Sequence, residues 1–302
     1  MTTPLILDCD PGHDDAIALL LALASPEIEL VGVTTVHGNQ TLEKTTDNAL
    51  RVLAIAGRED VPVAAGADRP LERELHVAAH VHGESGLDGP ELPERASDPV
   101  GQHAVDFLLE RVTPETVLVP VGPLTNVALA LERGLAPARI VLMGGSIAEG
   151  NMTPAAEFNI WADPEAAARV FGSGLHVTMI GLDVTHRALL TPDWGERFRR
   201  AGAVGTFVAE LVEFFKQYHR RTYSWDGAPI HDAVALAHAL RPGIVRTEHL
   251  NVEIETQSEL CRGRTVVDRW HRTDREPNAD VGVDVDGDAF FELLLERIAI
   301  LG

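Results

Sequence analysis

Short runs of β-branched and aliphatic residues alternate along the first two-thirds of the chain with longer segments whose apolar residues recur at helical spacing. The short runs predict strands at residues 5–10, 28–36, 61–65, 116–122, 139–145 and 176–185. The longer segments predict helices at residues 14–24, 41–56, 104–111, 126–132 and 164–171. Strands that are apolar on both faces and alternate with helices are typical of an α/β protein. We therefore expect an open, mostly parallel sheet flanked by helices.

The pattern changes in the last third of the chain. A long helix, a loop with the sequence SWDGAPI and a second helix are predicted at residues 203–223, 224–230 and 231–240. Three β-branched runs and a closing helix follow at residues 251–256, 265–269, 280–286 and 289–298. The three runs predict a small C-terminal β extension on the main sheet. No linker divides the chain, so we expect one domain over residues 1–302.

Composition and charge restrict the expected partners. The chain has 302 residues, of which 45% are hydrophobic and 24% charged, as in an ordinary globular protein. Its 46 acidic residues outnumber the 25 basic ones, and the net charge of -21 repels phosphate backbones and anionic lipid surfaces. We therefore expect no nucleic-acid or membrane partner, whereas a divalent cation or a neutral polar metabolite is compatible.

The sequence indicates a cytoplasmic location. The first residues, MTTPLILDCD, carry no basic segment before the first aspartate, unlike a secretory signal. The apolar run at residues 16–24 is far shorter than the ~20 residues that cross a bilayer. The chain has only two cysteines, Cys9 and Cys261, too few for a disulfide framework.

Four aspartates are concentrated around the end of the first predicted strand: Asp8, Asp10, Asp14 and Asp15. Strand alternation places Asp8 and Asp10 on one face, and Asp14 and Asp15 begin the next helix after a Pro-Gly turn. Open α/β sheets bind ligands at the carboxyl ends of their strands, so Asp10, Asp14 and Asp15 are expected to converge there. Carboxylates this close remain ionised together only beside a positive charge, and oxygen ligands favour Ca²⁺ or Mg²⁺ over zinc.

Other interpretations of this cluster remain open. Asp14 and Asp15 suit the first turn of a helix for electrostatic reasons alone, and Asp8 can be a hydrogen-bonded structural group. In haloacid-dehalogenase-like phosphatases a strand ends in D-x-D, which here would make Asp8 a nucleophile and Asp10 an acid. In those phosphatases, however, the D-x-D is followed by a small hydroxyl residue and an apolar residue, whereas here it is followed by PGHDD. The phosphatase mechanism also needs a later lysine, and this chain has few lysines.

The segment DCDPGHDDAIAL resembles the D-x-D-P-G-x-D-D signature of the nucleoside hydrolases, which cleave the N-glycosidic bond of ribonucleosides around a bound Ca²⁺. Further segments are similar to the family's blocks in the same order: VHGNQTLEKTTDNAL, VHGESGLDGP, VGPLTNVALAL, MGGS, GNMTPAAEFNIWADPEAA, GLDVTH and DGAPIHDAVALA. The resemblance covers nearly the whole chain. The first block and VHGESGLDG are most similar to the pyrimidine-preferring branch.

The resemblance implies roles for individual residues. The family's calcium ligands match Asp10, Asp15, Asp232 and the main-chain carbonyl of Thr125. Positions around the ribose and the attacking water match Asp14, Asn39, Asn151, Met152, Glu157 and Asn159. On the side of the leaving base the match is His231, and His82, within a predicted long loop at residues 69–98, is a second candidate.

The implied chemistry is water attack on C1′ through an oxocarbenium-like state. Calcium would coordinate the water and the 2′ and 3′ hydroxyls, while Asp10 takes the water's proton as general base. Metal contacts to the ribose diol would select ribose over deoxyribose. The resemblance also implies a homodimer or homotetramer.

The end of the long predicted helix supplies candidates for base selectivity, namely Tyr218, His219 and Tyr223. Their rings suit hydrogen bonding to, or stacking on, a pyrimidine, but their helical spacing is equally typical of a packing face. The sequence thus favours a calcium-dependent hydrolase of uridine and cytidine. A phosphatase and a non-catalytic protein that binds a nucleoside or ribose are the alternatives.

Overall fold

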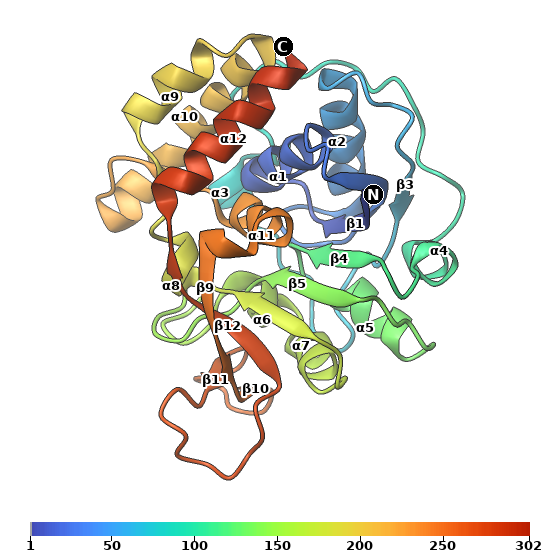
Figure 1. Ribbon diagram of the computed structural model, residues 1–302, viewed down its shortest axis with the longest axis vertical. Helices are drawn as coiled ribbons and strands as arrows, with labels where there is room; N and C mark the ends of the chain where they lie inside the picture. The colour runs from blue at the N-terminus through green and yellow to red at the C-terminus, as the bar shows by residue number, and fades with distance from the viewer. Residues whose placement is uncertain (1) are drawn as a thin grey trace.

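The computed structural model describes residues 2–302 and centres on an eight-stranded sheet. Its strand order is β3-β2-β1-β4-β5-β6-β12-β9, and every pairing is parallel except that of β12 with β9 (Figure 1). The strands are β1 (Thr3–Cys9), β2 (Ile28–Thr35), β3 (Val63–Ala65), β4 (Val117–Pro120), β5 (Arg139–Met143), β6 (Val177–Ile180), β9 (Val245–Leu250) and β12 (Ala279–Val285). The predicted α/β class with an open, mostly parallel sheet is confirmed.

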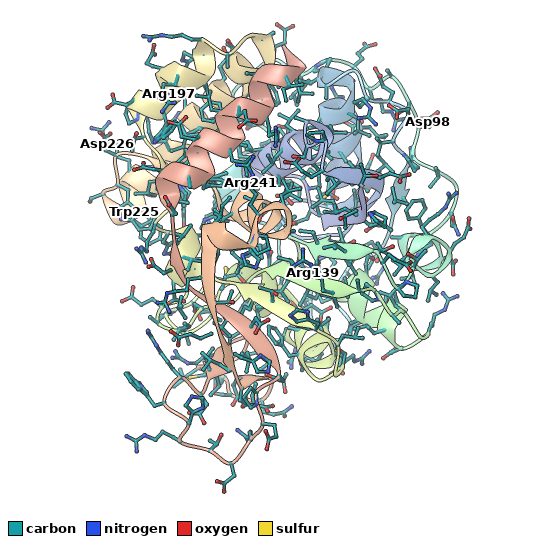
Figure 2. All side chains as sticks on the ribbon, viewed as in Figure 1. Asp98, Arg139, Arg197, Trp225, Asp226 and Arg241 are labelled. Atoms are coloured by element: carbon teal, nitrogen blue, oxygen red, sulfur yellow. The ribbon has the colours of Figure 1, made fainter. Side chains whose placement is uncertain are left out.

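Helices cover both faces of the sheet because alternate side chains of its strands are apolar on both sides. On β1, Leu5 and Leu7 enter one buried cluster whereas Ile6 enters the other. The first cluster includes residues of α1 (His13–Leu23), α2 (Leu42–Ile55), α10 (Ala203–Tyr223), α11 (His231–Leu240) and α12 (Gly287–Leu301). The second includes residues of α4 (Ala104–Arg111), α5 (Thr125–Leu131), α6 (Phe158–Ala162) and α7 (Pro164–Phe171). Charged side chains such as Asp98, Asp226 and Arg241 lie on the outside (Figure 2).

The C-terminal β extension has two parts. β12 and β9 lengthen the main sheet beyond β6, whereas β10 (Val252–Ile254) and β11 (Thr265–Val267) form a separate antiparallel pair, in the region that projects at the bottom of Figure 1. The prediction of a strand at residues 251–256 was thus too long, and β9 was not predicted. The residues of β9, VRTEHL, include three charged or titratable side chains on its partly exposed centre, which hid the strand pattern.

Two other segments differ from the expectation. The predicted strand at residues 176–185 ends at Ile180, because Gly181 begins a short helix, α8 (Leu182–Thr185). The predicted long loop at residues 69–98 contains the one-turn helix α3 (Ala79–His82). Both turns were too short to produce a helical period in the sequence. The remaining elements are α9 (Pro192–Arg199), the pair β7 (Leu189–Leu190) and β8 (Ala228–Pro229), and a 3-10 turn (Pro242–Ile244). None of the helices within residues 2–302 is long and apolar enough to cross a membrane.

His238 of α11 makes the stability of this fold sensitive to acid. Burial lowers its pKa to about 4, the nearby Arg139 acts in the same direction, and Asp280 and a backbone contact with Val245 oppose it. Between about pH 6.5 and pH 4 the unfolded chain therefore binds a proton here that the folded chain does not, so stability falls as the pH is lowered through this window. The contribution is at most about 3 kcal/mol.

Replacing His238 by leucine is expected to flatten the dependence of the free energy of unfolding on pH between pH 6.5 and pH 4. Urea unfolding at several pH values measures this slope, and the exposed His271 replaced by asparagine is the control. A slope unchanged by His238→Leu would show that another group dominates the acid response.

Candidate active site

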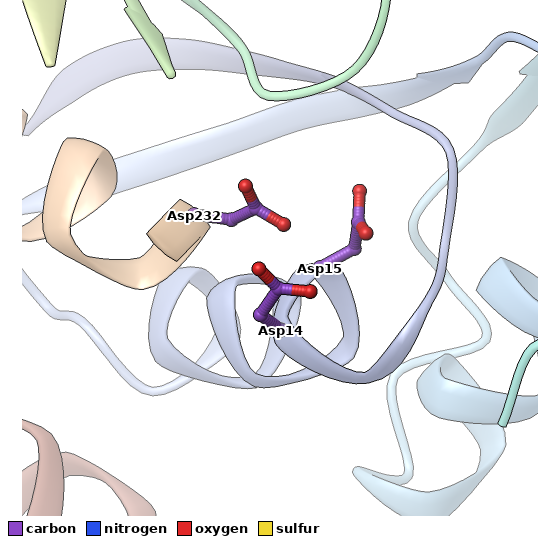
Figure 3. A group of neighbouring side chains, drawn as sticks. All are labelled: Asp14, Asp15 and Asp232. Atoms are coloured by element: carbon purple, nitrogen blue, oxygen red, sulfur yellow. The ribbon is translucent and has the colours of Figure 1, made fainter. Parts of the chain in front are cut away.

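Three buried carboxylates meet at the carboxyl edge of the sheet. Asp14 and Asp15 lie in the first turn of α1, and Asp232 is the second residue of α11. One carboxylate oxygen from each lies within 4.8 Å of the others. Figure 3 shows the three side chains pointing into the same space between α1 and the start of α11. Asp15 and Asp232, two of the predicted metal ligands, thus meet although they lie far apart in the sequence, and the third carboxylate beside them is Asp14 instead of Asp10.

Asp10 follows β1 directly, and both of its carboxylate oxygens are enclosed. Oδ2 accepts a hydrogen bond from the main-chain N–H of Asn39 at 2.6 Å, whereas Oδ1 is buried without a hydrogen-bond partner among residues 2–302. Two glycines permit this packing: a Cβ at Gly38 would lie 2.0 Å from Oδ2, and one at Gly122 would lie 2.5 Å from Oδ1. The orphaned oxygen leaves Asp10 with capacity for a cation or a water molecule.

Asp15 ties the Pro-Gly turn to the neighbouring loop. Its Oδ1 accepts the N–H of Asp10 at 3.0 Å, and its Oδ2 accepts the N–H of Gly12 at 3.0 Å and Nδ2 of Asn39 at 2.9 Å. Asn39 also donates to the carbonyl of Asp10 at 3.2 Å. These bonds fix Asp10, Asp15 and Asn39 relative to one another before any ligand binds.

Burial raises the pKa of every carboxyl group in this cluster. Desolvation is the larger cause for Asp10, Asp14, Asp15 and Asp232, and the neighbouring carboxylates add to it for Asp10, Asp14 and Asp232. The pKa of Asp14 reaches about 8. Bound protons or a bound cation must offset the crowded negative charge of such a cluster, and oxygen-only ligands suit Ca²⁺ or Mg²⁺.

Asp8 does not belong to this cluster. Its Oδ1 accepts hydrogen bonds from Oγ1 of Thr34 at 2.5 Å and from Nδ2 of Asn126 at 2.8 Å, so it links β1 to β2 and α5. Burial raises its pKa to about 6. The structural interpretation of Asp8 therefore fits its contacts, whereas the phosphatase interpretation requires Asp8 as an accessible nucleophile.

Thr125 begins α5 at the same edge of the sheet and is buried. Its hydroxyl donates to Asp163 at 2.7 Å and lies 3.1 Å from Nε2 of His37. The side-chain hydroxyl of Thr125 is thus hydrogen-bonded to other residues of the fold. The main-chain carbonyl of Thr125 stays a predicted metal ligand.

A partly open cavity lies beside the cluster. The predicted residues that line it are Asp14, Asn39, His82, Asn151, Met152, Glu157, Asn159, Tyr218, His219, Tyr223, His231 and Asp232. Asp10, Asp15 and Thr125 are not among the lining residues, since they are fully or almost fully buried. The sequence did not single out eight further lining residues: Ala78, His80, Val81, Val121, Met143, Phe158, His186 and Phe215. The structure brings the predicted set together, and the role of each residue stays a prediction.

Glu157 and Asn159 are held rigidly at one wall of the cavity. Glu157 caps α6 by accepting the N–H groups of Asn159 and Ile160 at 2.9 and 3.1 Å, and it accepts the N–H of Gly145 at 2.9 Å. Burial raises the pKa of Glu157 to about 7. Asn159 donates Nδ2 to the carbonyl of Val121 at 2.6 Å, so its Oδ1 is the atom left for a ligand. This wall therefore offers fixed oxygen acceptors.

Two histidines line the cavity with their Nδ1 atoms occupied. Nδ1 of His231 lies 2.7 Å from Oγ1 of Thr185. Nδ1 of His82 contacts two atoms of His13: it accepts the main-chain N–H of His13 at 3.3 Å and lies 3.1 Å from Nδ1 of the His13 ring. Nε2 of the same His13 ring lies 2.8 Å from the carbonyl oxygen of Asp88. Burial lowers the pKa of His82 and of His231 well below 6.5, so both rings are neutral at neutral pH. His13 thus anchors the segment that carries His82.

The aromatic residues at the end of α10 both line the cavity and pack on one another. The ring of His219 stacks on that of Tyr223 at 6.0 Å and meets that of Tyr218 edge-on at 5.3 Å. Trp225 stacks on Tyr223 at 4.5 Å and contacts His186 edge-on at 5.0 Å. The two interpretations of this helix, a packing face and a base-binding face, are therefore compatible.

An α/β sheet with a buried carboxylate cluster at its carboxyl edge is the arrangement expected of an enzyme that uses a divalent cation. The comparisons with known proteins identify the family. The family model described as "Inosine-uridine preferring nucleoside hydrolase" matches residues 5–292. The chain belongs to this family and is an enzyme of the glycosidase type. The predicted family is thereby confirmed. The family is metal-dependent, and the acidic cluster fits that property.

Individual relatives match over their full length. Pyrimidine-specific ribonucleoside hydrolases RihA from Klebsiella pneumoniae and Photobacterium profundum are each 52% identical over 308 residues, covering 99% of both chains. Among solved structures, a purine-preferring ribonucleoside hydrolase from Gardnerella vaginalis has a TM-score of 0.92 at 35% identity, covering 99% of this chain and 98% of its own. A plant nucleoside hydrolase has a TM-score of 0.92 at 34% identity and 99% coverage of both chains.

Proposed function

We propose that this protein hydrolyses pyrimidine ribonucleosides, uridine and cytidine, to the free base and ribose with the help of calcium. The observation that carries the proposal is the meeting of Asp14, Asp15 and Asp232 beside a cavity with oxygen acceptors on one wall and aromatic rings on another. The preference for pyrimidines is supported by the 52% identical relatives, which are named pyrimidine-specific.

The residues present fit a calcium ion. The proposed ligands are Asp10, Asp15, Asp232 and the carbonyl of Thr125, an oxygen-only set that includes the orphaned Oδ1 of Asp10. When bound, the ion would orient the attacking water and the ribose diol and lower the pKa of that water. The buried carboxylates would then remain ionised, since a divalent charge offsets their repulsion.

Asp10 acts as the general base in this proposal. Its carboxylate takes the proton of the attacking water, and Asn39, which bonds to both Asp10 and Asp15, holds that carboxylate in place. The ribose hydroxyls are bound by polar groups on the cavity wall, with Met152 at their border: Asp14, Asn151, Glu157 and Asn159. Positioning by these fixed groups lowers the entropic part of the barrier.

The base leaves toward the opposite side of the cavity. There His231 and His82 assist its departure, and Tyr218, His219 and Tyr223 bind the pyrimidine ring. Because both histidines are buried and neutral, they act as hydrogen-bond donors to the departing base. Negative charge that develops on the base is stabilised in this way.

Incubation with a panel of purine and pyrimidine ribonucleosides, with and without a chelator, tests the proposal by following free base. Uracil and cytosine release that is faster than purine release and stops with the chelator is the expected result. Hydrolysis of p-nitrophenyl phosphate with Mg²⁺ and of no nucleoside would favour the phosphatase interpretation. Uridine binding without uracil release would favour the binding protein.

We also propose a cytoplasmic location and a homodimer or homotetramer, without a nucleic-acid or membrane partner. The charge of -21 and the two free cysteines support the location and the absence of polyanionic partners. Light scattering after size-exclusion chromatography measures the mass of the assembly, and a mass of 32.6 kDa would contradict the proposed oligomer.

A further inference from the structure

The hydroxyl of Thr185 contacts the ring of His231 from beneath the cavity. Thr185 ends α8, directly after β6, and its side chain is fully buried. Its Oγ1 lies 2.7 Å from Nδ1 of His231, the first residue of α11. Within residues 2–302 this is the one hydrogen bond that the hydroxyl makes. The contact joins two helices that are 46 residues apart in the sequence.

This single contact determines which ring nitrogen of a neutral His231 carries the proton. A neutral imidazole has one N–H donor and one bare acceptor, whereas a hydroxyl can donate or accept. If Oγ1 accepted a proton from Nδ1, the hydroxyl hydrogen would be buried without an acceptor, at a cost of about 1–3 kcal/mol. The hydroxyl therefore donates to Nδ1, and the ring carries its hydrogen on Nε2.

The opposite nitrogen is free to act on a ligand. His231 lines the cavity, and its Nε2 has no hydrogen-bond partner among residues 2–302. The rings of His186 and His219 contact that of His231 at centroid distances of 5.6 and 6.5 Å and limit its tilt. Thr185 and these two rings together hold Nε2–H toward the space in which the base would lie.

We propose that Thr185 is a positioning residue that keeps His231 in the Nε2–H form and aims this N–H at the departing pyrimidine. The inference rests on the proposed function and assigns a residue that the sequence did not single out. When the bond between C1′ and the base breaks, its electron pair stays with the base, and the N–H stabilises the resulting negative charge by a hydrogen bond without giving up its proton.

A pair of substrates separates positioning from general damage to the fold. Uridine needs a donor for its departing base, whereas the p-nitrophenolate of p-nitrophenyl β-D-riboside is a good leaving group and needs none. In Thr185→Val, kcat for uridine is expected to fall roughly 10- to 100-fold, with kcat for p-nitrophenyl riboside within about threefold and both KM values little changed. Thr185→Ser, which keeps the hydroxyl, is expected to restore kcat for uridine.

Thr178→Val is the matched control, because Thr178 is a buried threonine of the neighbouring strand β6 and does not line the cavity. Thr178→Val is expected to leave kcat unchanged for both uridine and p-nitrophenyl riboside. An equal loss on both substrates in Thr185→Val, or no loss on uridine, would overturn the proposal. Failure of Thr185→Ser to restore activity would overturn it as well.

Nuclear magnetic resonance of the full chain labelled with nitrogen-15 histidine gives a readout independent of activity. The ring signals of His231, assigned by their absence in His231→Gln, are expected to show the Nε2–H form, and Thr185→Val is expected to give a mixture of both forms. The same form in both proteins would overturn the proposal. If the unmodified protein released no base from any nucleoside, the proposed function would fail, and these signals would still decide the role of Thr185.

Discussion

Replacement of Asp10 by asparagine is expected to lower kcat for uridine hydrolysis by roughly 10²- to 10⁴-fold, the range that a general base contributes. Asparagine has nearly the same shape and retains an oxygen that accepts the N–H of Asn39, so the loop is expected to stay in place. An amide cannot take the proton of water at neutral pH. Initial rates at saturating uridine and saturating calcium measure the effect on kcat separately from weaker metal binding.

The matched control for this substitution is Asp8→Asn, two residues earlier on β1. Asp8 is equally buried, but its bonded oxygen faces Thr34 and Asn126. We expect Asp8→Asn to lower the melting temperature and to leave kcat within about tenfold, since it contacts no reacting atom. Full activity of Asp10→Asn would exclude Asp10 as the base, and loss of uridine hydrolysis in a folded Asp8→Asn protein would contradict the structural interpretation of Asp8.

The central strands were predictable because each is a short apolar run with helices on both sides. β1, β2, β4 and β5 occupy buried positions, so hydrophobicity alone marks them. β9 escaped prediction since it pairs at the edge of the sheet and exposes charged residues such as Arg246. Edge strands and one-turn helices depend on tertiary contacts, which leave little periodicity in the sequence.

The local part of the site was also predictable. Asp10, Asp14 and Asp15 lie within six positions, and the strand–turn–helix pattern places them at one edge of the sheet. Asp232 lies more than 200 positions away, so its inclusion depended on the family resemblance. His186 and Thr185 were missed because a ring or a hydroxyl on a short helix has no spacing signal, and its function depends on which residue it faces.

Removal of calcium is expected to abolish base release and to lower the melting temperature together. Without a cation, Asp14, Asp15 and Asp232 crowd their carboxylates within 4.8 Å in a buried site, where each must be protonated or repel the others. Calcium at about 100 times its dissociation constant adds about 2.7 kcal/mol to the free energy of unfolding, which raises the melting temperature by roughly 5 °C. Thermal denaturation and uracil release after dialysis against chelator, before and after calcium is restored, measure both effects.

Two substitutions decide whether this response originates at the carboxylate cluster. Asp232→Asn removes one charge from the cluster, so the apo protein is expected to be more stable than the unmodified apo protein and to gain less from calcium. Asp98→Asn, at an exposed position, is expected to respond as the unmodified protein does. Equal melting temperatures with and without calcium, together with full activity in chelator, would require the carboxylates to work as protonated groups. In that case Asp14, whose pKa burial raises to about 8, would be a hydrogen-bond donor to the ribose instead of a charged acceptor.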